Sequence, residues 1–148
     1  MKILIDGDGC PVIDLTLEIA KHYGIEVIIF CDTSHHIERA GATTRVVTKG
    51  SDAVDFILVN EAKSGDLVIT QDYGLAAMVL AKKAQAMNQN GLIFSDANMS
   101  SLLFSRHVAK EVRRQGGRTK GPKKRDSKQN EAFKISLIKL LEADPSVH

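Results

Sequence analysis

The chain has 148 residues, of which 43% are hydrophobic and 26% are charged, a balance typical of globular proteins and unlike that of disordered chains. A length of this order predicts a single domain over residues 1–148. No apolar run approaches the roughly 20 residues that a membrane-spanning helix needs, and nothing near the start predicts a secretion signal. The only cysteines are Cys10 and Cys31, so we expect no disulfide framework, a cytoplasmic location and no membrane partner.

The formal net charge of +2 conceals an uneven distribution of charge. Residues 1–105 carry 8 basic and 13 acidic side chains, a net −5. Residues 106–128 carry 10 basic and 2 acidic side chains, a local +8, and the remaining residues add −1. The chain is therefore an acidic body with a basic segment at 106–128, and such segments are typical of proteins that contact polyanions.

In chain order, the first half alternates short apolar runs with helical periodicity. The run at 2–5 predicts a buried strand, and apolar residues then recur at helical spacing from Val12 to Tyr23. Further strands are predicted at 25–31 and 43–48, followed by a helix from Ser51 or Asp52 to about Lys63.

The second half continues the alternation. A strand is predicted at 66–70, a helix at 75–84, weak strands at 86–87 and 92–94, a longer helix at 99–115 and a last helix at 132–142. Strands that alternate with helices predict a three-layer α/β/α fold with a mainly parallel central sheet. In such folds, ligands bind beyond the carboxyl ends of the strands, near the point where the strand order reverses.

Acidic residues follow three of the predicted strands. They are Asp6 and Asp8 in DGDGCPV, Asp52 and Asp55 in KGSDAVDF, and Asp72 in TQDYGLA. In a parallel sheet these carboxylates share one edge, where they repel one another unless a cation neutralises them. Oxygen ligands of this kind select Mg²⁺ or Mn²⁺, and such a site supports the chemistry of metal-dependent nucleases and phosphatases.

Helix capping is the alternative explanation for these acids. An aspartate at a helix N-terminus accepts hydrogen bonds from free backbone N–H groups and complements the helix dipole without any further function. This applies with most force to Asp55 and Asp72. Asp6 is different, because it ends an apolar strand, where a buried charge without a partner is costly.

The sequence Asp6-Gly7-Asp8-Gly9 resembles the D-x-D-G motif of haloacid-dehalogenase-type phosphatases, and that resemblance implies Asp6 as the nucleophile. In that family a hydroxyl, a lysine and an acidic pair follow in order. Here Thr70 and Lys82 or Lys83 are available, but the acidic pair at 52 and 55 precedes the hydroxyl. We therefore keep the phosphatase as the alternative hypothesis.

Several blocks together resemble the YaiI/YqxD family of bacterial proteins over nearly the whole chain. They are DGDGCPV, KGSDAVDFI, GDLVITQDYGLAAMVL, and the later RxxxxxxRRQGG and GP. That family looks similar to PIN-type nuclease domains, in which acids at the ends of parallel strands hold Mg²⁺ or Mn²⁺ for phosphodiester hydrolysis. The resemblance implies Asp6, Asp52 and Asp72 as catalytic acids, with Asp8 or Asp55 completing the metal site.

Cysteine and histidine chemistry is less strongly indicated. Cys10 precedes Pro11 at a helix start, where a small buried residue is the simpler interpretation. His35 and His36 follow Cys31 and Asp32, which suggests zinc, but adjacent histidines rarely bind one ion and the spacing matches no standard zinc motif. We therefore expect a solvated loop at 32–36.

The basic segment predicts a nucleic-acid contact. On the predicted helix, Arg106, Lys110, Arg113 and Arg114 share one face. The basic side chains that we assign to nucleic acid are these four with Arg118, Lys120, Lys123, Lys124 and Arg125. Such a density of charge attracts phosphates without reading sequence, and the absence of aromatic residues argues against base stacking. A solubilising surface is the alternative.

These patterns lead to one main hypothesis and two others. The main one is a PIN-like domain that hydrolyses or binds RNA with Mg²⁺ or Mn²⁺ at Asp6, Asp52 and Asp72. The others are the phosphatase and a non-catalytic nucleic-acid-binding module.

Overall fold

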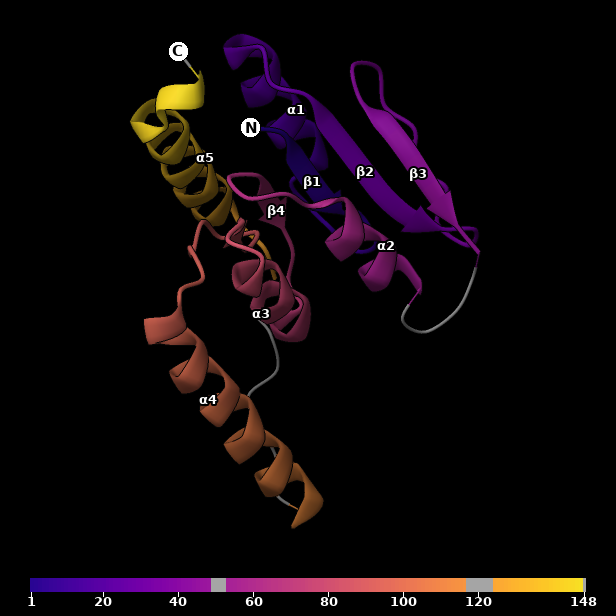
Figure 1. Cartoon of the computed structure of the whole chain (residues 1–148). Coiled ribbons are helices and arrows are strands. Elements are labelled where there is room, and N and C mark those ends of the chain that lie inside the picture. The colour runs from indigo at the N-terminus through magenta and orange to yellow at the C-terminus, as the bar shows by residue number, and fades with distance from the viewer. Residues whose placement is uncertain (49–52, 117–123, 148) are drawn as a thin grey trace.

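A parallel sheet forms the centre of the computed structural model, which describes residues 1–48, 53–116 and 124–147 (Figure 1). Its five strands in the described part of the chain lie in the order β3-β2-β1-β4-β5, and every neighbouring pair is parallel. The strands are β1 (Ile3–Asp6), β2 (Val27–Asp32), β3 (Thr43–Val47), β4 (Leu67–Ile69) and β5 (Gln85–Met87). The predicted parallel sheet is confirmed.

Helices cover both faces of this sheet. They are α1 (Ile13–Tyr23), α2 (Ala53–Glu61), α3 (Tyr73–Ala81), α4 (Asp96–Arg114) and α5 (Ser127–Ala143), followed by a 3₁₀ turn, η1 (Pro145–Val147). Ile3 and Ile5 pack with α1 and α5 on one face, whereas Leu4 packs with α2 and α3 on the other. This alternation of neighbouring side chains buries both faces, which confirms the three-layer α/β/α fold.

The strand order reverses next to β1. The chain first builds outward from β1 to β2 and β3, then returns to place β4 on the other side of β1. The carboxyl ends of β1 and β4 therefore flank the point where ligands bind in open α/β sheets. Asp6 ends β1, and 70–72 directly follow β4.

The last helix begins earlier than the hydrophobic pattern predicts, at Ser127 rather than Ala132. Asp126 caps it by accepting hydrogen bonds from the backbone N–H groups of Lys128 and Gln129, and the Gln129 side chain accepts from the Asp126 backbone N–H. The first turn is polar and exposed, so it carries no apolar periodicity. The capping box, not the hydrophobic pattern, decides where the helix starts.

The two weak strands behave differently. Residues 85–87 form β5 at the sheet edge, whereas Ile93 makes only an isolated antiparallel bridge to Met87. The tight turn between them brings Phe94 into the core beside Ala86.

Helix α4 packs through its first turns and then extends away from the sheet (Figure 1). Ser95 caps it in a capping box with Asn98, and Met99 is buried against α3. Further along, Phe104 is 67% exposed. Within the described residues, no helix is long and apolar enough to span a membrane.

Candidate metal centre

Asp6 lies where a fully buried strand opens onto the surface. Ile3, Leu4 and Ile5 before it have no exposed surface, and Asp6 itself is half-buried. Burial raises the pKa of Asp6 from 3.8 to about 6, a hydrogen bond from Thr70 opposes that rise, and the charges of Asp55, Asp8 and Asp72 add to it. A carboxylate in this position favours either a proton or a bound cation.

Thr70 connects Asp6 to the next strand. Its buried hydroxyl donates to Asp6 Oδ2 at 2.9 Å and accepts from the backbone N–H of Asp72 at 3.0 Å. Because the hydroxyl has a single proton, the accepted bond from Asp72 directs that proton to Asp6. Thr70 therefore fixes the position of Asp6 relative to the start of α3.

Asp72 is the N-cap of α3. Its Oδ1 accepts hydrogen bonds from the backbone N–H groups of Gly74 and Leu75, at 2.8 and 3.2 Å. The capping explanation for this residue is therefore correct, and it coexists with a place in the cavity wall. Capping occupies Oδ1 and holds the carboxylate in a defined orientation.

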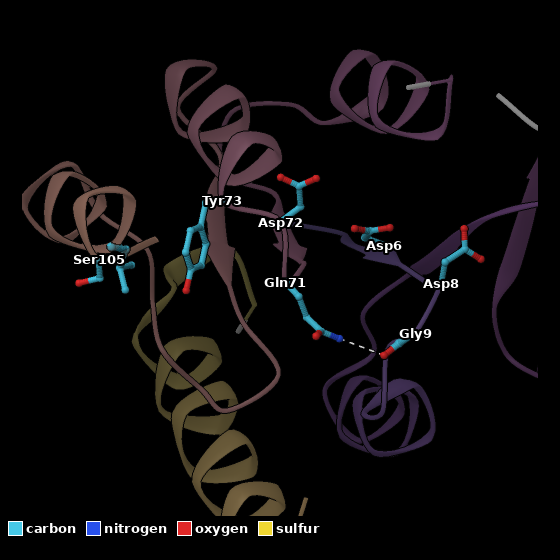
Figure 2. Close-up of a pocket in the computed structure, with 8 residues that line it drawn as sticks. Asp6, Asp8, Gly9, Gln71, Asp72, Tyr73 and Ser105 are labelled. Atoms are coloured by element: carbon cyan, nitrogen blue, oxygen red, sulfur yellow. Dashed lines mark hydrogen bonds between the residues drawn. The ribbon is translucent and has the colours of Figure 1, made fainter. Parts of the chain in front are cut away.

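An open cavity of about 720 Å³ lies between these residues (Figure 2). It is lined by Asp6, Asp8, Gly9, Gln71, Asp72, Tyr73, Leu102 and Ser105. Gln71 Nε2 donates to the backbone carbonyl of Gly9 at 2.9 Å, which ties the loop after β4 to the loop after β1. Three carboxylates thus share one cavity whose described lining contains no cationic side chain.

The structure brings together most of the acids that the sequence singles out. Asp6, Asp8 and Asp72 line the cavity, and Asp55 on α2 lies near enough for its charge to raise the pKa of Asp6. Asp52 lies outside the described residues. The structure thus brings Asp6, Asp8 and Asp72 to one cavity, whereas Asp55 is not among the residues that line it, and the role of these acids as metal ligands stays a prediction.

The donor atoms of the cavity are of the kind that a hard divalent cation prefers, but Asp6, Asp8 and Asp72 do not all bring ligand atoms within 4.8 Å of one another, so at most two of these three would bind one ion. The acidic groups of the cavity are carboxylate oxygens, the ligands that Mg²⁺ and Mn²⁺ prefer. Asp6 has a raised pKa, and the hydrogen bond that lowers it comes from a single hydroxyl, on Thr70. A cation between Asp6 and Asp72 would relieve this unfavourable concentration of negative charge.

The predicted basic residues fall into three groups. Lys110, Arg113 and Arg114 lie on the second half of α4, as does Arg106, whose side chain is not among those described. Arg118, Lys120 and Lys123 lie outside the described residues, and Lys124 is exposed just before α5. Their assignment to nucleic acid stays a prediction.

Arg125 has structural partners. Its guanidinium donates to Asn130 Oδ1, Asn90 Oδ1 and the Gln89 carbonyl at 2.7–2.8 Å. These bonds fasten the start of α5 to the turn that follows β5. Arg114, on α4, pairs with Glu111 at 2.7 Å.

The sequence does not indicate four further residues of the cavity wall, Gln71, Tyr73, Leu102 and Ser105. Tyr73, Leu102 and Ser105 line the cavity because α3 and α4 pack side by side, with Tyr73 edge-on to Phe94, whereas Gln71 lies in the loop between β4 and α3. The sequence suggests Thr70 only as the hydroxyl of the phosphatase alternative. Its position before the capping Asp72, at a strand end, is the one local signal that points to a role in the site.

Comparison with known proteins identifies the family. Residues 4–143 match the family model described as "Uncharacterized BCR, YaiI/YqxD family". The chain belongs to the YaiI/YqxD family. The match spans the sheet, the cavity and α5, so the resemblance read from the sequence blocks is confirmed.

Relatives of the YaiI/YqxD family align along almost the full length. A UPF0178 protein of Exiguobacterium sibiricum is 55% identical over 141 residues, which are 95% of this chain and 96% of the relative. One from Ruminiclostridium cellulolyticum is 48% identical over 144 residues, 97% and 94% of the two chains. One from Clostridium acetobutylicum is 40% identical over 143 residues, 95% and 97% of the two chains. No solved structure gives a significant match.

Proposed function

We propose that this YaiI/YqxD protein is a metal-dependent nuclease that uses Mg²⁺ or Mn²⁺ to hydrolyse RNA phosphodiesters. The observation that carries the proposal is the convergence of Asp6, Asp8 and Asp72 on one open cavity beside the reversal of strand order. The choice of RNA as substrate rests on the resemblance to PIN-type nucleases.

Each residue around the cavity has a proposed role. Asp6 and Asp72 would hold the ion, with Asp8, Asp55 and Asp52 as the further acids. A bound divalent ion supplies charge neutralisation at the phosphoryl group and activation of water. Thr70 keeps Asp6 oriented through its 2.9 Å hydrogen bond, and Gln71 holds the two loops at their spacing.

In this proposal, basic side chains of α4 bind the nucleic-acid substrate next to the cavity. An acidic cavity repels phosphate, so a nucleic-acid substrate requires a cationic surface nearby. Ser105 lines the cavity, and Lys110, Arg113 and Arg114 follow it on the same helix. With a rise of about 1.5 Å and 3.6 residues per turn, Arg113 lies roughly 12 Å beyond Ser105 along the helix axis and near the same face of α4. A nucleic-acid backbone that contacts this helix would therefore lead into the cavity.

The phosphatase alternative gains no support from the geometry. Among the described residues, no lysine lines the cavity. Lys82, the candidate lysine, instead donates to the Val59 carbonyl at 2.6 Å, at the opposite end of α3.

The direct test is cleavage of a labelled single-stranded RNA by the full-length protein. We expect cleavage with Mg²⁺ or Mn²⁺, none in EDTA, and a loss of at least about 100-fold in Asp6→Asn, because a metal ligand matters at least as much as its outer-shell partners. Asp14→Asn is the matched control, since Asp14 is an exposed residue of α1 that pairs with Arg39.

Three outcomes would contradict the nuclease proposal. Cleavage that persists unchanged in Asp6→Asn excludes a role for this cavity. Salt-dependent RNA binding without any Mg²⁺ or Mn²⁺ binding by calorimetry indicates a binding module instead. A trapped phospho-aspartyl enzyme that is absent from Asp6→Asn indicates the phosphatase.

A further inference from the structure

A second group of metal-ligating side chains lies beside the cavity, at the carboxyl ends of β1 and β2. Its members are Asp8, Asp32 and His35. Asp6 pairs with Phe30 in the register of β1 and β2. Asp8 and Asp32 each lie two residues beyond that pair, so the parallel strands deliver both carboxylates to the same level of the sheet edge.

Gly7 makes their close approach feasible. Its backbone N–H donates to the Phe30 carbonyl at 2.8 Å, and a Cβ at this position would lie only 2.9 Å from the same oxygen. Any larger residue would therefore push the loop after β1 away from β2. With glycine, the loop stays against β2 and Asp8 remains next to Asp32.

The three side chains converge on one point. His35 Nδ1 forms a 3.1 Å hydrogen bond with Asp32 Oδ1 and lies 3.6 Å from Asp8 Oδ1, so a metal ion would replace the hydrogen bond between His35 and Asp32. One ligand atom from each residue lies within 4.8 Å of the others. Asp32 Oδ1 also accepts from the Ser34 backbone N–H at 2.8 Å, which holds this carboxylate in place.

Asp8 Oδ1 supplies an independent observation. This oxygen has almost no solvent contact, and its contact with His35 Nδ1, an ion pair at 3.6 Å, is too long for a hydrogen bond, although the Asp8 side chain as a whole is 29% exposed. Buried polar atoms almost always have a hydrogen-bond partner, and one without a partner calls for an explanation. A cation at the convergence point would supply the missing partner.

The donor set indicates which cation would bind. Two carboxylate oxygens and one imidazole nitrogen suit a borderline transition metal, because imidazole nitrogen favours Zn²⁺ over Mg²⁺. Three protein ligands with a remaining open position are typical of zinc sites that take water or a substrate. The cavity at Asp6 and Asp72 is built from oxygens alone and favours the harder ions.

We propose that Asp8, Asp32 and His35 form a second divalent-metal site, selective for Zn²⁺ over Mg²⁺, at the edge of the acidic cavity. The site goes beyond the proposed nuclease activity. It shares Asp8 with that proposal, but Asp32 and His35 take no part in the nuclease site. His36, its neighbour in sequence, lies outside the site and pairs with Glu38 at 2.9 Å. The structure therefore places only His35 of the two adjacent histidines at the site, a distinction that sequence spacing alone could not make.

The test is calorimetric titration of Zn²⁺ into the metal-free full-length protein. We expect His35→Gln and Asp32→Asn to weaken Zn²⁺ binding by at least about tenfold, since loss of an outer-shell partner alone costs that much. His36→Gln is the matched control and should bind Zn²⁺ as the wild type does. Excess Mg²⁺ should not displace Zn²⁺ from the wild-type protein.

A spectroscopic readout checks the ligand directly. Zn²⁺ should shift the imidazole ¹⁵N resonances of His35 and leave those of His36 in place, in protein whose circular dichroism is unchanged. The proposal is overturned if the wild type binds Zn²⁺ no more tightly than His35→Gln, as expected when a protonated His35 alone bridges the two carboxylates. It is equally overturned if His36→Gln weakens binding as much as His35→Gln.

A separate variant distinguishes this proposal from the nuclease proposal. Asp6→Asn should keep its Zn²⁺ affinity while losing RNA cleavage. Zn²⁺ binding that survives in a protein without nuclease activity supports the second site and refutes only the nuclease. Loss of Zn²⁺ binding in Asp6→Asn contradicts the second site, because Asp6 is not among its ligands.

Discussion

Asp6 is held in a position that disfavours its charge. The strand before it is fully buried, and other carboxylates lie nearby, so its pKa rises to about 6 from an ordinary 3.8. Because the folded protein binds this proton more tightly than the unfolded chain, the raised pKa costs no stability below about pH 3. The loss of unfolding free energy that this raised pKa causes grows as the pH rises towards about 6, and above that it approaches about 3 kcal/mol.

This pKa leads to a prediction for Asp6→Asn, a variant whose amide oxygen can still accept from Thr70. In EDTA, we compare the free energy of unfolding of Asp6→Asn with that of the wild type. We expect the difference to shift in favour of the variant by up to about 3 kcal/mol as the pH rises from about 4 to about 8. Chemical denaturation at both values measures this. Added Mg²⁺ should reduce the difference at pH 8 by binding the wild type. A difference that does not change with pH would contradict the raised pKa.

Thr70 is a positioning residue for Asp6 and for the start of α3. In Thr70→Val, which is nearly isosteric, Asp6 loses its donor and the Asp72 backbone N–H loses its acceptor. We expect a loss of about 1–3 kcal/mol in the free energy of unfolding and a further rise in the pKa of Asp6. Thr70→Ser keeps the hydroxyl and should restore both quantities. If Val and Ser variants behave alike in the pH dependence of stability, the hydroxyl has no such role.

At the scale of elements, α3 begins at a residue with two roles. Asp72 caps the helix through Oδ1 and also lines the cavity. Asn caps helices as well as Asp does, whereas Ala does not cap them. Asparagine and alanine therefore separate the cap from the charge.

The corresponding prediction uses both substitutions. Asp72→Ala should lose about 1 kcal/mol of stability, within a range of roughly 0.5–2, and Asp72→Asn should stay near the wild type. Both should lose Mg²⁺ affinity by calorimetry. Unchanged Mg²⁺ affinity in the asparagine variant would show that Asp72 is a cap alone.

Several elements could be predicted from the sequence because their local patterns agree with their final environment. The apolar runs that become β1, β2 and β4 are buried on both faces. A parallel strand that helices cover on both sides has a nearly continuous apolar sequence, so it can be predicted from that sequence alone. The start of α5 could not be read this way, since its first turn is exposed and only the Asp126 capping box marks it. The bridge at Ile93 depends on its partner Met87 rather than on its own neighbours.

At the scale of the molecule, the opposing charges divide between two parts of one fold. Asp6, Asp8 and Asp72 lie at the carboxyl edge of the sheet, and Lys110, Arg113 and Arg114 lie on the part of α4 that extends away from it (Figure 1). Both parts meet at the cavity, where Leu102 and Ser105 of α4 form one wall (Figure 2). A net charge near zero therefore hides a negative site beside a positive helix.

The charged helix predicts salt-dependent RNA binding. For single-stranded RNA, each lost phosphate contact reduces the slope of log affinity against log salt by about 0.7. We expect Lys110→Glu to weaken binding and flatten this slope, measured by fluorescence anisotropy between about 50 and 200 mM salt. Lys134→Glu makes the same charge change on α5, at an exposed position away from α4. Equal losses in both variants would indicate a net-charge effect rather than a contact with α4.

The candidate site could be predicted only in part. The positions of Asp6, Asp8 and Asp72 just after apolar runs indicated the sheet edge, because parallel strands direct their carboxyl ends to one side. Thr70, Gln71 and Ser105 carry no comparable pattern, since each owes its role to a neighbour distant in sequence. The pairing of Asp8 with Asp32 depends on strand register, which no local spacing reveals.

By itself, the sequence determined the alternation of strands and helices, the burial of the sheet on both faces and the acidity of one edge. These properties follow from local periodicity and from residue type. Only the tertiary structure decided that β1 lies between β2 and β4, so that Asp6 and Asp72 line one cavity on one side and Asp8 lies near Asp32 on the other. The physical reason is that strand order, register and burial arise from long-range contacts, and these set both the distances between the carboxylates and the cost of their charge.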